Sequence, residues 1–206
     1  LSRCAELCRR YDVLLIADEV QTGLGRSGRL LACDHEGVRP DGLILGKALG
    51  GGLLPVSAFL ADRRVMDVFG PGDHGSTFGG NPLAAAVGTE VLALLAETRP
   101  WERAERLGER LIARLRTAAL PCVREVRGRG LLIGLALDPA LADAGEVAER
   151  LLARGIATRD TNGNVIRLAP PLVIDEATLD EAASRIVDTL RALVPADAAA
   201  TVAHMQ

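Results

Sequence analysis

The pattern of apolar and polar residues changes character near residue 98 of the chain. Before that point, short continuous apolar runs at 13–18, 42–46 and 55–62 predict strands buried on both faces, as in a parallel sheet. Helices are expected over 2–10, 63–69 and 83–97, and a loop rich in glycine and polar residues separates the last two. This order of elements predicts an α/β unit over residues 1–97.

The second half predicts a smaller α+β unit over residues 98–195. Helical periodicity runs through 101–118, and the segment VREVRGRGLLIGLALD predicts a pair of antiparallel strands. A helix over 144–154, closed by Gly155, is followed by short strands at 156–159 and 164–168. Asp175 is expected to cap a last helix that ends near residue 193. Residues 196–206 have no clear periodicity and predict a flexible tail.

Composition narrows the classes of protein to which the chain can belong. Of 206 residues, 49% are apolar and only 2% aromatic, which predicts a core of aliphatic side chains. The net charge is −3, and the arginines are interleaved with acids, so neither a nucleic acid nor a membrane surface is indicated as a partner. No metal site is expected, because the four cysteines match no zinc or redox spacing. They suit a reducing compartment, which predicts a cytoplasmic protein.

Two residues at predicted strand ends stand out. Asp18 closes the run VLLIAD and Lys47 directly follows GLILG. Ligands of open α/β sheets bind beyond the carboxyl ends of the strands, although Asp18 could equally cap a helix or contact solvent. A lysine in a low-dielectric crevice at that edge would have a depressed pKa and would act as a nucleophile toward carbonyl groups. A lysine beside an acid is also what pyridoxal phosphate requires, because the amine binds its aldehyde and the acid keeps its ring nitrogen protonated.

Two long motifs carry a family resemblance that extends over nearly the whole chain. The stretch LLIADEVQTGLGRSGRLLACDHEGVRPDGLILGKALGGGLLPVSAFLA and the following PGDHGSTFGGNPLAAAVGTEVL resemble the class III aminotransferases, which depend on pyridoxal phosphate. The resemblance implies part of the fold type I large domain followed by a small C-terminal domain. A third motif, GNVIRLAPPLVIDEATLDEA, is most similar to that of the ornithine aminotransferases.

The resemblance implies roles for individual residues. Lys47 would bind the cofactor covalently and move the proton during transamination, and Asp18 would pair with the pyridine nitrogen. Gln21 would hydrogen-bond near the ring hydroxyl. Thr77, together with Ser76, would reach the cofactor phosphate of a neighbouring subunit, which implies a homodimer with shared active sites. The alternative for both hydroxyls is simple capping of the loop.

Arg167, in the third motif, would bind a carboxylate of the substrate. A guanidinium suits bidentate recognition of 2-oxoglutarate or glutamate better than an ammonium group does, and the alternative is a surface salt bridge. The implied reaction transfers the δ-amino group of ornithine to 2-oxoglutarate and forms glutamate semialdehyde and glutamate.

Two other functions remain open at this point. Another class III ω-aminotransferase, acting on acetylornithine, γ-aminobutyrate or a diamine, shares the first two motifs, and a non-catalytic remnant that dimerises is of a different class. The resemblance covers only the C-terminal half of such enzymes, and the chain opens with Leu1 inside an amphipathic segment. We therefore expect either a fragment of a longer protein or a truncated protein that has lost activity. Both would lack the phosphate loop and the ring-stacking aromatic residue.

Overall fold

The computed structural model describes residues 1–193, which form two compact units. The first unit spans Leu1–Glu102 and the second begins at Arg103, within the first turn of a helix. The tail predicted over 196–206 lies outside the described residues. No helix among residues 1–193 is both long and apolar enough to cross a bilayer.

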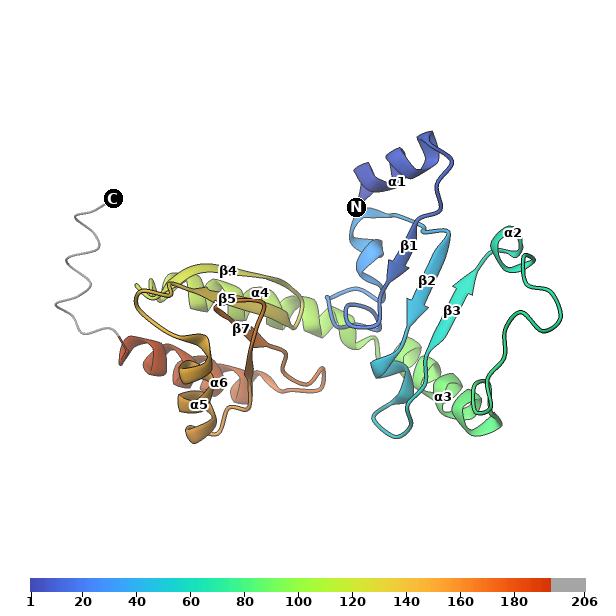
Figure 1. Ribbon diagram of the computed structural model, residues 1–206. Coiled ribbons are helices and arrows are strands. Elements are labelled where there is room, and N and C mark those ends of the chain that lie inside the picture. The colour runs from blue at the N-terminus through green and yellow to red at the C-terminus, as the bar shows by residue number, and fades with distance from the viewer. Residues whose placement is uncertain (194–206) are drawn as a thin grey trace. The chain divides into compact units, whose positions relative to one another are not determined.

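The first unit is built on a three-stranded sheet in the order β1-β2-β3 (Figure 1). Strands β1 and β2 pair in parallel, whereas β3 is antiparallel to β2. The elements are α1 (Ser2–Arg10), β1 (Ile16–Asp18), the 3-10 helix η1 (Ala32–Glu36), β2 (Gly42–Leu45), the 3-10 helix η2 (Lys47–Gly50), β3 (Ala58–Ala61), α2 (Arg63–Met66) and α3 (Pro82–Thr98).

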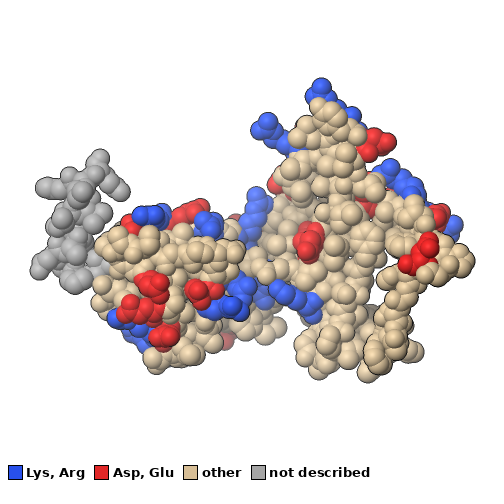
Figure 2. All heavy atoms as spheres, viewed as in Figure 1, with Lys and Arg blue, Asp and Glu red and all other residues tan. Residues whose placement is uncertain are grey.

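The prediction of strands buried on both faces is wrong for two of the three strands. Ile16 of β1 is 50% exposed, and Phe59 and Leu60 of β3 are 40% and 47% exposed. The apolar runs were correctly placed, but a small sheet leaves its outer strands without a covering layer on every face. Much of the visible surface of this unit carries neither acidic nor basic side chains (Figure 2).

Helix α3 illustrates the same feature of the first unit. The Asn81 side chain caps it by accepting from the Ala84 backbone N–H at 2.9 Å, and Pro82 occupies the first turn, where no N–H is needed. The helix is apolar on nearly every side, yet only Ala84 and Gly88 are buried. Gly88 faces Leu49 of η2, so α3 supports the segment that begins with Lys47.

The second unit has a four-stranded antiparallel sheet in the order β4-β5-β7-β6. Three helices accompany it, and the predicted β4–β5 hairpin is confirmed. The elements are α4 (Pro100–Thr117), β4 (Val123–Arg129), β5 (Leu132–Leu137), α5 (Ala144–Ala153), β6 (Arg159–Thr161), β7 (Val165–Leu168) and α6 (Glu176–Arg191).

One strand of this sheet lies further along the chain than predicted. We expected a strand over 156–159, but β6 begins at Arg159. The Ile156 backbone N–H donates to the Leu151 carbonyl at 2.9 Å, and Gly155 has φ of +80°. Ile156 therefore belongs to the turn that ends α5, which delays the start of the strand.

The second unit has a continuous aliphatic core. Helix α4 contributes Leu107, Leu111 and Leu115 at four-residue spacing. Strand β5 contributes Ile133 and Leu135 to the same core. All five are at most 3% exposed. Burial of side chains of this size stabilises a fold by about 2 kcal/mol each, so this unit has the larger share of the chain's apolar stabilisation.

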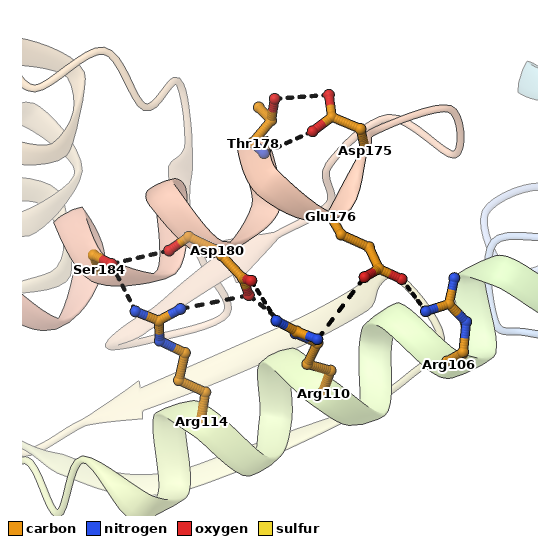
Figure 3. Close-up of polar contacts among 8 residues, drawn as sticks. All are labelled: Arg106, Arg110, Arg114, Asp175, Glu176, Thr178, Asp180 and Ser184. Atoms are coloured by element: carbon orange, nitrogen blue, oxygen red, sulfur yellow. Dashed lines mark hydrogen bonds and ion pairs between the residues drawn. The ribbon is translucent and has the colours of Figure 1, made fainter.

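Helices α4 and α6 are joined by a ladder of charged contacts (Figure 3). Arg106 pairs with Glu176, Arg110 pairs with Asp180, and Arg114 donates to the Ser184 hydroxyl at 2.6 Å. Both series advance by four residues, so the rungs follow one face of each helix and show that the two helices run in the same direction. The pairs are largely exposed to solvent and therefore contribute modestly.

Replacing Gly108 by alanine is expected to destabilise the second unit. A Cβ atom at this position of α4 would lie 1.9 Å from the Gly130 carbonyl oxygen in the β4–β5 turn, so helix and hairpin would have to separate. We expect a loss of about 2 kcal/mol in the free energy of unfolding, measured by urea denaturation. Gly88→Ala is the matched control, because its Cβ would meet Leu49 at an ordinary 3.8 Å. Equal stability of G108A and the parent would contradict the close approach.

Acidification is expected to weaken the ladder. Hydrogen bonds from Arg106 and Arg110 lower the pKa of Glu176 and Asp180, respectively. Because the folded-state pKa lies below the unfolded value, the stabilisation is fully present above the ordinary carboxyl pKa of about 4 and is lost as pH falls through the folded value. The thermal midpoint of the double variant E176Q/D180N should therefore fall less steeply with pH than that of the parent.

A control variant distinguishes the effect of the ladder from the loss of stability that acid causes elsewhere in the protein. Glu149 is exposed on α5, and no ion pair involves it among the described residues, so E149Q should reproduce the parental acid profile. Coincident profiles for the parent and E176Q/D180N would show that the ladder contributes nothing.

Candidate active site

Parallel pairing brings two predicted site residues to one edge of the first sheet. Asp18 is the last residue of β1 and stands opposite Ile44 of β2. Lys47 follows two residues after β2 ends. Because parallel strands end at the same edge, the carboxylate and the amine both emerge where α/β proteins bind ligands.

Gln21 contacts the lysine directly. The Lys47 Nζ donates a hydrogen bond to the Gln21 Oε1 at 3.0 Å. Gln21 lies in the turn that follows β1, two residues beyond Glu19. The structure thus brings Lys47 and Gln21 together from segments 26 residues apart. The Asp18 Oδ1 accepts from the Val20 backbone N–H at 3.1 Å, which fixes that carboxylate at the start of the same turn.

The predicted low-dielectric crevice around Lys47 is not formed by the described residues. The side chains of Lys47 and Asp18 are both exposed. The segment after Lys47 contains three consecutive glycines, which have no side chains to cover the amine. The amine and the carboxylate are therefore accessible to a ligand.

The backbone of Lys47 is in an uncommon conformation. Its φ of +46° lies in the left-handed region, which costs a residue with a side chain about 1 kcal/mol. The next turn is held by the burial of Leu49, which is 5% exposed and packs in the small core with Leu24 and Leu45. Such strain, held in place by packing, is typical of functional positions.

Sequence reasoning missed a buried carboxylate beside these residues. Glu19 is only 3% exposed and accepts hydrogen bonds from the Cys33 backbone N–H at 2.8 Å and the Cys33 Sγ at 3.1 Å. The Thr22 hydroxyl donates to its second oxygen. Glu19 therefore ties the two ends of the 20–33 loop together, and Gln21 lies within that loop. The sequence signal that could have revealed Glu19 is its position directly after Asp18, the last residue of the strand.

The hydrogen bonds also determine the protonation of this cluster. Burial on its own raises the pKa of Glu19, but the donors Thr22 and Cys33 outweigh it, so the pKa lies below its usual value. Burial, together with the adjacent Glu19 carboxylate, raises the pKa of the Cys33 thiol to about 12. Glu19 is therefore a carboxylate and Cys33 an unreactive thiol at neutral pH.

Sequence reasoning also missed the fact that Lys47 is the only lysine in the chain. The sequence has 24 lysine and arginine residues, and all except Lys47 are arginines. Any covalent capture of an aldehyde by a side-chain amine is thereby assigned to one position.

Ser76 and Thr77 lie in the exposed loop between α2 and α3. The Ser76 hydroxyl accepts from the Gly79 backbone N–H at 2.8 Å, so it does cap a local turn. Neither side chain hydrogen-bonds to Lys47, Gln21 or Asp18 among residues 1–193. The ring of His74, in the same loop, lies tilted by 42° against that of Phe69, with ring centroids 5.9 Å apart.

Arg167 belongs to the second unit. It lies on β7 between Gly134 of β5 and Arg159 of β6, and its backbone carbonyl accepts from the Thr158 hydroxyl at 2.6 Å. The side chain is half-buried, and no ion pair involves it in the described part of the chain. The surface salt bridge considered as an alternative is therefore not formed here.

The residues of the first unit fit the chemistry of pyridoxal phosphate. An exposed primary amine is available to the cofactor's aldehyde, an exposed carboxylate at the same sheet edge is available to its ring nitrogen, and an amide oxygen contacts the amine. The hydroxyls of the 70–82 loop are chemically suited to a phosphate.

Comparison with known proteins defines the class to which the chain belongs. The family model "Aminotransferase class-III" matches residues 1–190. The chain therefore belongs to the class III aminotransferases, and the resemblance seen in the sequence motifs is confirmed.

Individual relatives agree with this assignment. The ornithine aminotransferase of Bacillus cereus (strain Q1) is 50% identical over 90% of this chain and 46% of its own length. A solved ornithine aminotransferase from Toxoplasma gondii, described with partial occupancy of PLP at its active site, has a TM-score of 0.90 and 47% identity over 93% of this chain and 46% of that one. An acetylornithine aminotransferase from Elizabethkingia anophelis has a TM-score of 0.87 and 46% identity over 92% and 48%.

Two facts follow from these matches. The predicted fold class is confirmed, since the mixed α/β structure superimposes on part of the aminotransferase fold. The chain spans about half the length of the curated relatives that it matches.

Replacing Glu19 by glutamine is expected to loosen the 20–33 loop. The Cys33 N–H, the Cys33 thiol and the Thr22 hydroxyl all donate to Glu19, and an amide offers them only one oxygen. We expect a loss of about 2 kcal/mol in the free energy of unfolding and faster amide hydrogen exchange at Cys33. Glu90→Gln, an exposed substitution on α3, is the control. Unchanged exchange at Cys33 in E19Q would show that the carboxylate does not hold the loop.

Proposed function

We propose that this chain supplies the amine-bearing part of a pyridoxal-phosphate-dependent ornithine aminotransferase. The observation that carries the proposal is the 3.0 Å hydrogen bond from the Lys47 amine to Gln21, at the sheet edge where Asp18 also ends its strand. The ornithine aminotransferases among its relatives, at about half of positions identical, support the choice of substrate.

Each candidate residue has a role under this proposal. Lys47 is the covalent anchor for the cofactor's aldehyde and afterwards holds and returns the proton at its Nζ. Asp18 provides the negative charge that keeps the ring nitrogen protonated, and Gln21 orients the amine and the ring hydroxyl. Bound pyridoxal phosphate supplies an electron sink for the carbon that carries the amino group. Ser76 and Thr77 donate to a phosphate.

Arg167 is proposed to bind a carboxylate of the amino acid or the 2-oxo acid. Its guanidinium has no competing acid among the described residues, which leaves its donors available for a bidentate contact. In the reaction, ornithine gives its δ-amino group to 2-oxoglutarate. We propose that residues 1–97 belong to the cofactor-binding large domain and that residues 98–195 form the small domain that presents Arg167.

A second candidate substrate deserves its own test. The acetylornithine aminotransferase of Elizabethkingia anophelis is as similar to this chain in sequence as the ornithine enzymes of solved structure are. An ω-aminotransferase for acetylornithine is therefore the alternative. Transamination rates of the active enzyme with ornithine, acetylornithine, γ-aminobutyrate and a diamine as donors decide between them.

We also propose that the protein works as a homodimer in the cytoplasm. The first unit exposes many large apolar side chains, among them Leu53 at 81% and Phe78 at 81%, which suits a surface that contacts another polypeptide. Phe78 directly follows Thr77, so the proposed phosphate-binding residue lies beside this surface. All four cysteines are free thiols, which is typical of a reducing compartment.

Trapping the cofactor on Lys47 tests the proposal directly. The chain is mixed with pyridoxal phosphate, reduced with borohydride, digested and mapped by mass spectrometry. We expect one pyridoxyl group on the peptide that contains Lys47, since no other lysine is available. Lys47→Arg keeps the charge but cannot bond to the aldehyde, and it should lose the modification. Equal labelling of K47R, or labelling of the N-terminal amine alone, would overturn the proposed role.

A further inference from the structure

Three arginines form a row across the sheet of the second unit. The register places Arg127 of β4 opposite Gly134 of β5, Gly134 opposite Arg167 of β7, and Arg167 opposite Arg159 of β6. Directly opposed residues of antiparallel strands project to the same side of the sheet, so all three arginines share one face.

This face is the one turned away from the aliphatic core. Leu135 and Ile166, which neighbour the row along β5 and β7, are both 0% exposed and belong to the core, so the residues that alternate with them point outward. Gly134 has no side chain, and the Arg127 side chain lies beside it, since a Cβ atom at Gly134 would meet the Arg127 Cγ and Nε at 3.8 Å. Arg159, on the outer strand of the row, is exposed to solvent.

Two of the three positive charges are uncompensated. Arg127 pairs with Glu125 at 2.5 Å on its own strand. The side chains of Arg159 and Arg167 take part in no hydrogen bond or ion pair within the described chain. Their Cβ atoms lie roughly 5 Å apart by the geometry of directly opposed residues, and like charges at that spacing destabilise a sheet. An anion bound between them would turn this repulsion into attraction.

We infer that Arg159 is a second carboxylate-binding residue and that, with Arg167, it selects a dicarboxylate acceptor. The inference rests on the proposed function, in which Arg167 binds one carboxylate of the 2-oxo acid. Two guanidinium groups on adjacent strands match a ligand with two carboxylates a few carbon atoms apart. A monocarboxylate 2-oxo acid engages only Arg167 and gains nothing from Arg159.

Binding of 2-oxoglutarate and pyruvate to the whole chain tests this inference without the cofactor. The titrations follow the Arg Nε–Hε resonances in nitrogen-15 NMR spectra, assigned by the Arg→Gln variants. We expect Arg159→Gln to weaken the binding of 2-oxoglutarate roughly fivefold, the effect of an exposed charge contact, and to leave pyruvate within about twofold. Arg167→Gln should weaken both ligands.

Arg127→Gln is the matched control, because Arg127 lies in the same row but is paired with Glu125 and separated from Arg167 by Gly134. It should leave both affinities unchanged. Equal losses in R127Q and R159Q would identify a diffuse positive surface and overturn the inference. Absence of 2-oxoglutarate binding, or a loss in R159Q that is the same for both acids, would also overturn it.

The outcome is separable from that of the cofactor proposal. The titration uses the parent chain without pyridoxal phosphate, so its result does not depend on covalent binding at Lys47. Failure of trapping at Lys47 with intact Arg159-dependent binding would reject the cofactor role alone, and the reverse result would reject the dicarboxylate site alone.

Discussion

Parallel pairing of β1 with β2 is the constraint on which the candidate site depends. Two strands that run in the same direction must end at the same edge, so Asp18 and Lys47 both lie at that edge although 28 residues separate them in the chain. The loop that makes the crossover would be free to vary without Glu19, whose buried carboxylate collects donors from both of its ends. Gln21 reaches the lysine amine because the loop that carries it is tied in this way.

The two units reach stability by different means. The second unit buries leucine and isoleucine side chains from three helices and a sheet, and a charged ladder aligns two of those helices. The small core of the first unit contains three buried apolar residues, with polar anchors such as Glu19 and Asn81 at the loop and helix ends. The first unit, organised by polar anchors, leaves the sheet edge with Asp18 and Lys47 exposed, whereas the arginines of the second unit lie on the strands of a well-packed sheet.

Much of this arrangement could be predicted from the sequence, and the exceptions have physical reasons. Helices were placed well because their apolar spacing and their caps, such as Asp175, are local signals. The antiparallel direction of β3 relative to β2 was not predictable, since an apolar run looks the same for a parallel and an antiparallel strand. The role of Glu19 was not predicted, because its donors Thr22 and Cys33 come near its carboxylate only in the folded loop. The pairing of Arg159 with Arg167 depends on strand register, and the start of β6 was itself misplaced by the turn that ends α5.

The solitary lysine has a consequence for how the protein can be handled. An endoproteinase that cleaves after lysine has one site in the whole sequence, at the Lys47–Ala48 bond. A modified lysine resists such cleavage, so the ratio of intact chain to two fragments on a gel reads the occupancy of the site directly. Cleavage at this one bond therefore reports whether the Lys47 side chain is modified or free.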